Sequence, residues 1–360
     1  MNAEQALAAT EGIDTPVAVL DEAAMERNLT AMARHAAGAG LALRPHAKTH
    51  KSGWIGMRQV EHGAIGLTVA TLQEAETFAA AGVDDLLVAF PPAGEARLRR
   101  LAALAPRVRR LAVGLDDVEL ARQVPEAVEV LWEVDTGLHR VGTEPGEPTA
   151  RAVQELVAAI GQARFRGLVT HGGHAYGGDR RGAAEDERSG LVATAELLRQ
   201  AGVEVRELSV GSTPTAGFAT AGSGLTEMRP GTYVFGDANQ VVLGSHALAD
   251  CALAVAATVV SRHASWFVVD AGSKALPADL RVTGLQGFGT VVGRPELRVE
   301  RLSEEHAVVE GGSAAVGDRL LILPAHVCTA VNLHPELLVF GPAGIRWEPV
   351  TARGWRSPGG

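Results

Sequence analysis

Eight short apolar runs alternate with helix-like stretches rich in Ala, Leu, Glu and Arg between residues 22 and 240. Such alternation is typical of parallel β-strands joined by helices. Eight repeats of this kind predict a (β/α)₈ barrel, a TIM-like α/β fold. A doubly wound open sheet is the alternative, but no glycine-rich dinucleotide fingerprint follows the first run. The predicted strands cover residues 41–43, 65–69, 86–90, 110–113, 128–134, 167–170, 207–210 and 227–235.

The residue pattern changes beyond about residue 240, where short runs of alternating apolar and polar residues, separated by Gly and Pro, replace the helical stretches. This pattern predicts a mainly antiparallel β domain. Near the start of the chain, residues 15–20 form one further strand-like run, and Asp21 is suited to cap the helix that follows. The predicted strands of the β domain cover residues 252–260, 266–269, 287–292, 307–309, 319–323 and 337–340.

Composition limits the functions open to the chain. With 360 residues it is long enough for one large domain and a smaller one. The formal net charge of −9 at pH 7 argues against nucleic acid as a partner. No apolar run approaches the roughly 20 residues needed to cross a membrane, and no signal-peptide pattern opens the chain. We therefore expect a cytoplasmic protein without a membrane partner.

The first predicted barrel strand is followed by Arg44-Pro45-His46-Ala47-Lys48-Thr49-His50-Lys51, which holds five cationic or titratable side chains. Like charge around a lysine disfavours its ammonium form, and the neutral amine is the nucleophile that Schiff-base chemistry needs. The stretch therefore indicates Lys48 as a reactive lysine. A solvated loop is the alternative, since Lys and Arg side chains are mostly exposed.

This stretch closely resembles the cofactor-lysine signature of the D-threonine aldolase and D-serine dehydratase family, pyridoxal-phosphate enzymes of the alanine-racemase-like fold. The resemblance implies that Lys48 holds pyridoxal 5'-phosphate (PLP), that the run at residues 15–20 joins the β domain, and that the protein is a homodimer. We expect a cofactor-binding barrel over residues 22–240, and a β domain formed by residues 1–21 and 241–360. Further matching motifs follow in order: Asp14-Thr15-Pro16, Asp135-Thr136-Gly137 with Arg140-Val141-Gly142, Gly211-Ser212-Thr213-Pro214, Arg229-Pro230-Gly231-Thr232-Tyr233, Asp270-Ala271-Gly272-Ser273-Lys274 and His326-Val327-Cys328.

Two short segments are candidates for binding the cofactor phosphate. In such barrels the chemistry lies at the carboxyl ends of the strands, with phosphate often held after the seventh and eighth. Small residues, backbone N–H groups and hydroxyls suit a phosphate monoester when no P-loop is present. An ordinary turn is the alternative for Gly-Ser-Thr-Pro. The candidate residues are Gly211, Ser212 and Thr213 after the seventh predicted strand and Gly231, Thr232 and Tyr233 at the end of the eighth.

Other residues near strand ends are assigned to the cofactor by the resemblance. It implies that His46 and Arg140 contact the cofactor, although a structural salt bridge with Asp135 is the alternative for Arg140. It also implies that Tyr176 touches the ring nitrogen. A buried tyrosine that satisfies its own hydroxyl is the alternative for that residue.

His326 and Cys328 are two apart in a stretch predicted to be extended, which would place both side chains on one face. Imidazole and thiolate suit zinc, and a site with few protein ligands leaves positions open for substrate and water. A core cysteine beside a surface histidine is the alternative. The resemblance implies that the pair binds a divalent metal, zinc first, with Mn or Mg as alternatives. The other cysteine, Cys251, is interpreted as a core thiol, because two cysteines are too few for a disulfide framework.

These parts predict a PLP-dependent, metal-assisted lyase for β-hydroxy D-amino acids. If Lys48 removes the Cα proton and the metal helps hydroxide leave, D-serine gives a 2-oxo acid and ammonia. Imidazole titrates near neutral pH, so the histidines nearby, including His171, are candidates for proton transfer. If His174 or His50 takes the β-hydroxyl proton, D-threonine gives glycine and acetaldehyde. Cys328 resembles the dehydratase branch, which favours dehydration.

Two other functions are less compatible with the sequence. Alanine racemases of this fold take a second base, a tyrosine, from the β domain, whereas Tyr176 and Tyr233 are the only tyrosines and both fall in the predicted barrel half. A non-catalytic PLP-binding protein would keep the barrel and the lysine, but such proteins usually lack a second domain.

Overall fold

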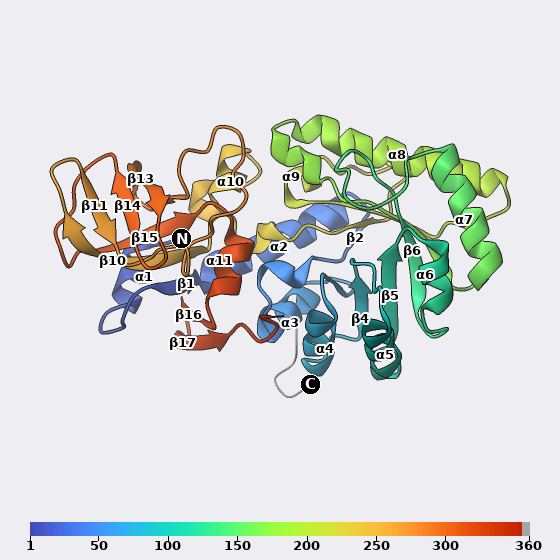
Figure 1. Cartoon of the computed structure of the whole chain (residues 1–360), viewed down its shortest axis with the longest axis horizontal. Coiled ribbons are helices and arrows are strands. Elements are labelled where there is room, and N and C mark those ends of the chain that lie inside the picture. The colour runs from blue at the N-terminus through green and yellow to red at the C-terminus, as the bar shows by residue number, and fades with distance from the viewer. Residues whose placement is uncertain (355–360) are drawn as a thin grey trace. The chain divides into compact units, whose positions relative to one another are not determined.

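The computed structural model describes residues 1–354, which form two compact units (Figure 1). The barrel unit consists of Met32–Lys48 and Gly53–Gly231, and the β unit of Met1–Ala31, Thr49–Ser52 and Thr232–Arg353. Within the described residues, no helix is both long and apolar enough to cross a bilayer. The domain boundaries expected from the sequence remain a prediction, and the last six residues of the expected β domain, 355–360, lie outside the described part.

Eight parallel strands form the core of the barrel unit, in the order β2-β9-β8-β7-β6-β5-β4-β3. The bridge between His46 and Thr68 joins the first and last of these strands. Two backbone hydrogen bonds support it, from Ile65 N–H to the Leu43 carbonyl at 2.9 Å and from Thr68 N–H to the Pro45 carbonyl at 2.8 Å. The predicted TIM-like barrel is therefore confirmed. Its strands are β2 (Ala42–Leu43), β3 (Leu67–Val69), β4 (Asp85–Val88), β5 (Arg110–Leu115), β6 (Glu129–Glu133), β7 (Phe165–Val169), β8 (Glu207–Val210) and β9 (Glu227–Met228).

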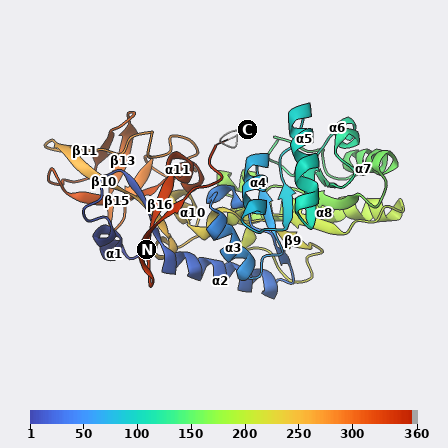
Figure 2. The same cartoon turned by 90° about the horizontal axis from the view of Figure 1, so that it is seen from below.

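Helices connect these strands (Figure 2). The first, α2 (Glu22–Gly38), begins where the sequence predicts, because the Asp21 carboxylate accepts the Ala24 N–H at 2.9 Å. Met25 and Leu29 on its apolar face are buried. The remaining helices are α3 (Gly53–Glu61), α4 (Leu72–Ala80), α5 (Glu95–Leu104), α6 (Val118–Gln123), α7 (Glu147–Ile160), α8 (Arg180–Gln200) and α9 (Thr213–Ala216).

The β unit holds a nine-stranded, mainly antiparallel sheet in the order β11-β14-β13-β12-β15-β10-β1-β16-β17. Because β11 also pairs with β10, six of these strands close into a small barrel with a core that includes Phe267, Leu297 and Ile322. Strand β1 pairs antiparallel with β10 and parallel with β16, as the resemblance implied for this segment. The strands are β1 (Val17–Asp21), β10 (Leu253–Arg262), β11 (Trp266–Val269), β12 (Gly289–Val291), β13 (Arg294–Leu302), β14 (Ala307–Glu310), β15 (Arg319–Pro324), β16 (Glu336–Gly341) and β17 (Gly344–Pro349).

The eighth barrel strand is shorter than the predicted strand at residues 227–235. Strand β9 ends at Met228, and Thr232–Val234 forms a 3₁₀ turn. Pro230 has no N–H to offer to a neighbouring strand, which ends regular pairing at this point. The turn carries Tyr233 into the β unit, so the argument that both tyrosines lie in the barrel half is wrong. Tyr233 is only 3% exposed.

Strands β13 and β17 were not expected from the sequence. In β13 only Leu297 and Val299 are buried, and Arg and Glu residues surround them, so the apolar pattern is too short to predict a strand. In β17 no residue is buried, and Ile345 and Trp347 are exposed. Both strands form because neighbouring strands supply hydrogen-bonding partners, and that contribution is not visible in the local sequence pattern.

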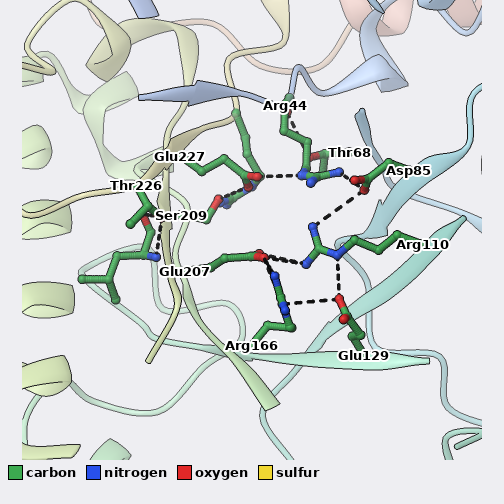
Figure 3. Close-up of polar contacts among 12 residues, drawn as sticks. Arg44, Thr68, Asp85, Arg110, Glu129, Arg166, Glu207, Ser209, Thr226 and Glu227 are labelled. Carbon is green, nitrogen blue, oxygen red and sulfur yellow. Dashed lines mark hydrogen bonds and ion pairs between the residues drawn. The ribbon is translucent and has the colours of Figure 1, made fainter. Parts of the chain in front are cut away.

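A network of ion pairs fills the amino-terminal end of the barrel (Figure 3). The fully buried Arg44 contacts Asp85 Oδ1 at 2.5 Å and Glu227 Oε2 at 2.7 Å. The neighbouring Arg110 contacts Glu129 at 2.6 Å and Glu207 at 2.8 Å. The four carboxylates open strands β4, β9, β6 and β8. The expectation that Arg44 places its charge beside Lys48 is therefore wrong, because two acidic side chains neutralise its guanidinium.

We expect the Arg44→Ala variant to lose about 3–5 kcal/mol of unfolding free energy, because Asp85 and Glu227 remain buried without their partner. Urea unfolding followed by circular dichroism measures the loss. The matched control is Arg99→Ala, which removes an exposed pair with Glu95 and should cost less than about 0.5 kcal/mol. A loss below about 1 kcal/mol for Arg44→Ala would show that the network does not stabilise the barrel.

Candidate active site

Lys48 lies in a 3₁₀ turn, Ala47–Thr49, directly after β2, and its side chain is half-buried. The chain contains only three lysines. Lys51 donates to Asn332 Oδ1 at 2.9 Å, and the exposed Lys274 pairs with Glu304 and Glu305. Lys48 is therefore the one lysine that follows a barrel strand and belongs to the barrel unit.

Two arginines and two histidines act on the electrostatics around Lys48. Burial and then the charge of Lys48 lower the pKa of His46 well below its usual range, and the same causes lower the pKa of His171 to about 3. Arg140 and Arg229 contribute in the same direction at both histidines. Both imidazoles are therefore neutral at pH 7. The charges of Arg140 and Arg229 therefore act on the same two histidines as the charge of Lys48.

The proton of His171 can be assigned from its contact. The Nδ1 atom lies 3.1 Å from the Gly211 carbonyl oxygen, which can only accept a hydrogen bond. Nδ1 therefore carries the proton in the neutral ring, and Nε2 is left as an acceptor. Such a nitrogen can accept a hydrogen bond from a substrate group.

Glu133 ends β6 and was not singled out in the sequence. Burial raises its pKa to about 7, against the charges of Arg229 and Arg140. Its carboxyl group points toward Gly114 on the neighbouring strand, where an added Cβ would lie 3.5 Å from Oε2. The only feature of the sequence that could have identified Glu133 is its position as a carboxylate at the end of an apolar strand. Glu133 gives the cationic region a group that titrates near neutral pH.

The raised pKa of Glu133 makes the free energy of unfolding depend on pH. The folded protein holds the proton more tightly than the unfolded chain, so stability falls as pH rises from about 4.5 and the loss is complete above about 7. We expect Glu133→Gln to remove this term. In urea unfolding of the cofactor-free protein, the variant should gain roughly 2 kcal/mol relative to wild type between pH 5 and pH 8. A difference that does not change with pH would contradict the assignment.

In the loop after β6, Asp135 binds other groups and does not form the salt bridge with Arg140 that was the alternative for this arginine. Asp135 accepts hydrogen bonds from the backbone N–H of Gly137 at 3.0 Å and of His139 at 2.9 Å, and lies 3.0 Å from the His139 ring. Arg140 is exposed, with its charge felt at His46 and His171.

The loop after β7 forms the 3₁₀ turn Gly173–Gly177, which carries His174 and Tyr176. Both side chains are half-buried. The His174 ring lies 3.3 Å from Asp186 Oδ2 and packs against Gly137, where an added Cβ would approach it to 3.3 Å. His171, at the start of this loop, has its pKa lowered by burial and by the charge of Lys48.

The phosphate candidates divide between the two units. Gly211 follows β8 with a φ of +125°, and Ser212 caps α9, where Thr213 is buried. A Cβ at Gly211 would lie 2.9 Å from the Arg229 backbone nitrogen, so only glycine fits this close approach. Gly231 follows β9 in the barrel unit, whereas Thr232 and Tyr233 belong to the β unit.

The predicted metal pair occupies a helix start rather than an extended segment, so that local expectation is wrong. His326 is the N-cap of α11 (Val327–Leu333), and Cys328 lies in its first turn. The cause is Asp237, whose buried carboxylate accepts the Val327 N–H at 3.0 Å and also caps α10 (Ala238–Val242). Burial raises the pKa of Asp237 to about 6.

A second carboxylate holds His326 in place. Asp279 Oδ2 lies 2.7 Å from His326 Nδ1, which leaves Nε2 as the nitrogen for a ligand. Burial lowers the pKa of His326, but negative charge on Cys328 and the contact with Asp279 outweigh it and raise the pKa to about 11, so a metal ion would have to displace the proton from Nε2. Asp279 carries no local sequence signal that would have identified it.

Cys328 and His50 lie in the same unit. The Cys328 Sγ atom lies 3.2 Å from Thr49 Oγ1. His50 is fully buried, and its Nδ1 accepts the Ser52 N–H at 3.2 Å. Within residues 1–354, no set of three or more His, Cys, Asp and Glu side chains is arranged to hold a metal ion. His326 and Cys328 would have to be completed by ligands from elsewhere, such as water or substrate.

A parallel barrel with a lysine after its first strand, joined to an antiparallel β domain, defines the alanine racemase-like class of proteins. The family described as alanine racemase, N-terminal domain, matches residues 20–239, and a serine dehydratase domain matches residues 252–340. A D-threo-3-hydroxyaspartate dehydratase of Delftia sp. is 37% identical over 95% of this chain and 98% of its own length. A D-threonine aldolase of Arthrobacter sp. is 33% identical, covering 95% of this chain and 93% of its own.

The chain therefore belongs to the D-threonine aldolase and D-serine dehydratase family, as the resemblance predicted. The named members are dehydratases and aldolases, which are lyases, so the prediction of an enzyme of this class is confirmed.

Solved structures agree with this assignment. A D-threo-3-hydroxyaspartate dehydratase variant with a cysteine replaced by alanine, in a metal-free form, superposes with a TM-score of 0.86 at 35% identity, covering 96% of this chain and 99% of its own. A variant with a histidine replaced by alanine superposes with a TM-score of 0.88 at 35% identity, covering 98% and 99%. The two replaced positions are two residues apart.

Proposed function

We propose that this protein is a PLP-dependent, metal-assisted dehydratase of β-hydroxy D-amino acids, which forms a 2-oxo acid and ammonia. The observation that carries the proposal is the position of Lys48. It is the only lysine of the barrel unit, it follows the first barrel strand, and its electrostatic neighbours are Arg140, Arg229 and two neutral imidazoles.

The residues of the barrel unit fit PLP. Arg140 and Arg229 provide positive charge for an anionic cofactor, and Glu133, with its raised pKa, is a buried carboxyl group that faces these cations. The peptide at Gly211 approaches Arg229 closely and offers a loop of small residues. When bound through Lys48, PLP supplies an electron sink for negative charge at the substrate Cα.

The roles of the protein side chains follow from their chemistry. Lys48, freed by the substrate amine, is the base that removes the Cα proton. Arg140, exposed after β6, is suited to bind the substrate carboxylate or the cofactor. His171, with an unprotonated Nε2, is suited to accept a hydrogen bond beside Lys48. Nine further residues remain candidate site residues in the roles predicted from the sequence: His46, His50, His174, Tyr176, Ser212, Thr213, Gly231, Thr232 and Tyr233.

A divalent metal, zinc first, is proposed at His326 Nε2 and Cys328 Sγ, where it would act as a Lewis acid toward the β-hydroxyl group. Asp279 supports this assignment because it fixes the ring and leaves Nε2 available. The Delftia dehydratase supports it as well, since its solved variants replace a histidine and a cysteine with the same spacing, and one is in a metal-free form.

Dehydration is preferred to aldol cleavage because the dehydratase relative shares 37% identity with this chain over nearly its full length. Aldol cleavage to glycine and an aldehyde is the second candidate, supported by the D-threonine aldolase relative at 33%. Both reactions use the same parts and differ in which proton is removed first, from Cα or from the β-hydroxyl group.

The test is a product assay on PLP- and metal-loaded protein given D-serine, D-threonine or D-threo-3-hydroxyaspartate. We expect 2-oxo acid and ammonia from at least one substrate, and loss of this activity after chelation. Glycine with an aldehyde, and no 2-oxo acid, would replace the dehydratase by the aldolase. Neither set of products from any of the three would contradict both, and L-isomers serve as controls.

Further expectations remain proposals. We propose a homodimer in the cytoplasm that acts on a small D-amino acid and has neither a nucleic-acid nor a membrane partner. The barrel over residues 22–240 would bind the cofactor, and the β domain formed by 1–21 and 241–360 would carry the metal pair.

A further inference from the structure

Glu187 is a buried acidic residue in the middle of α8, the helix between β7 and β8, and the proposed reaction does not use it. Its side chain is 2% exposed. A carboxylate at such a position is costly unless donors surround it. Burial raises the pKa of Glu187, while hydrogen bonds and the charge of Arg229 oppose that effect.

The Glu187 carboxylate contacts two different loops. The Gly211 N–H, after β8, donates to Oε1 at 2.8 Å. Gly172, after β7, and Thr215 in α9 lie close enough to the same carboxyl group to oppose the rise in its pKa. The loops are also joined directly, because the Ser212 hydroxyl donates to the Gly172 carbonyl at 3.2 Å. Glu187 is therefore a common anchor for the carboxyl-terminal loops of β7 and β8.

Gly172 leaves the space that this anchor needs. A Cβ at Gly172 would lie 2.6 Å from the Glu187 carboxyl group. The backbone φ of Gly172 is −73°, which any residue can adopt, so the demand for glycine comes from the carboxylate and not from the backbone.

The anchored peptide contacts the candidate site on its other side. The Gly211 N–H binds Glu187, while the Gly211 carbonyl accepts from His171 Nδ1 at 3.1 Å. Gly211 also lies against the backbone of Arg229. A displacement of Glu187 would therefore shift the peptide at Gly211, the His171 ring and the loop at Ser212 together.

We propose that Glu187 is a positioning residue that fixes the Gly172 and Gly211 loops in the arrangement that binds the phosphate group of the cofactor. This inference rests on the proposed function, because it assigns the loop at Gly211 to PLP.

The experiment compares binding of PLP with binding of pyridoxal, which has the same aldehyde and no phosphate, by spectroscopic titration of the cofactor-free protein. The variant is Glu187→Gln, which keeps the size of the side chain but removes its charge and one of its two acceptor oxygens. We expect PLP binding to weaken about tenfold and pyridoxal binding to change less than about twofold. The matched control, Glu196→Gln, alters an exposed residue of the same helix and should change neither affinity.

A second variant tests the same contact without removing the carboxylate. Gly172→Ala is compatible with the backbone and displaces the end of the Glu187 side chain, so its melting temperature is measured beside the two affinities to establish that the variant folds. It should also weaken PLP more than pyridoxal, including in the event that Glu187→Gln does not fold.

Each outcome decides the inference. Selective weakening of PLP in either variant supports it. Equal weakening of PLP and pyridoxal would assign Glu187 a general structural role and overturn the inference, and so would unchanged affinities in folded variants. If wild-type protein binds pyridoxal and PLP equally, the loops at Gly172 and Gly211 do not bind the phosphate group and the inference is wrong. If it binds neither compound, the proposed function fails together with this inference.

Discussion

The Lys48→Ala variant is expected to lose the visible absorption of bound PLP and at least about 10⁴-fold in kcat/KM. Alanine removes both the amine that would hold the cofactor and the base that would act at Cα. The other two lysines offer no replacement, because Lys51 is bound to Asn332 and Lys274 to two glutamates. Absorption spectra of the purified variant and the product assay measure the two effects.

The matched control is Lys274→Ala, which removes an exposed lysine and should leave both spectrum and activity unchanged. Equal melting temperatures of the cofactor-free proteins would exclude a folding defect in Lys48→Ala. A Lys48→Ala protein that keeps wild-type absorption would show that another amine holds the cofactor, and the account of the barrel site would be wrong.

Removal of the metal is expected to lower the dehydratase rate by about 10²-fold or more, because hydroxide then leaves the β-carbon without a Lewis acid. Chelated wild-type protein should recover activity on addition of zinc or another divalent ion. The variants His326→Ala and Cys328→Ser should resemble the chelated enzyme and should not be rescued by metal.

Cys251→Ala is the control for the metal prediction, since burial raises the pKa of this thiol to about 12 and it remains in the core. Metal content by elemental analysis should fall in the Cys328 variant and not in the Cys251 variant. Full activity of wild-type protein after chelation, with no bound metal detected, would remove metal assistance from the mechanism.

Local sequence patterns were sufficient for the barrel. Each apolar run between residues 22 and 240 became a strand, because a parallel strand covered by helices needs apolar side chains on both faces. The prediction failed at residues 230–235, where Pro230 ends the strand, and at β13, where charged residues hide two buried positions. These errors concern segments whose conformation depends on neighbouring strands.

Candidate site residues could be proposed from the sequence only where a residue belongs to a motif. Lys48 and Arg140 were proposed in this way, and both follow barrel strands, while their roles stay predictions. Partners distant in sequence were not identified: Asp279 beside His326 and Glu187 beside Gly211 are single acidic residues without a local pattern. The prediction that the Arg44 charge lies beside Lys48 failed for the same reason, since its partners Asp85 and Glu227 become neighbours only when the barrel closes.

Covalent trapping shows which lysine carries PLP. Wild-type protein with bound PLP is reduced with borohydride, digested, and examined by peptide mass spectrometry. We expect one pyridoxyl group, on Lys48, and none on Lys51 or Lys274. A pyridoxyl group on either of those residues, or no trapped cofactor on a protein that shows the visible absorption, would contradict the account.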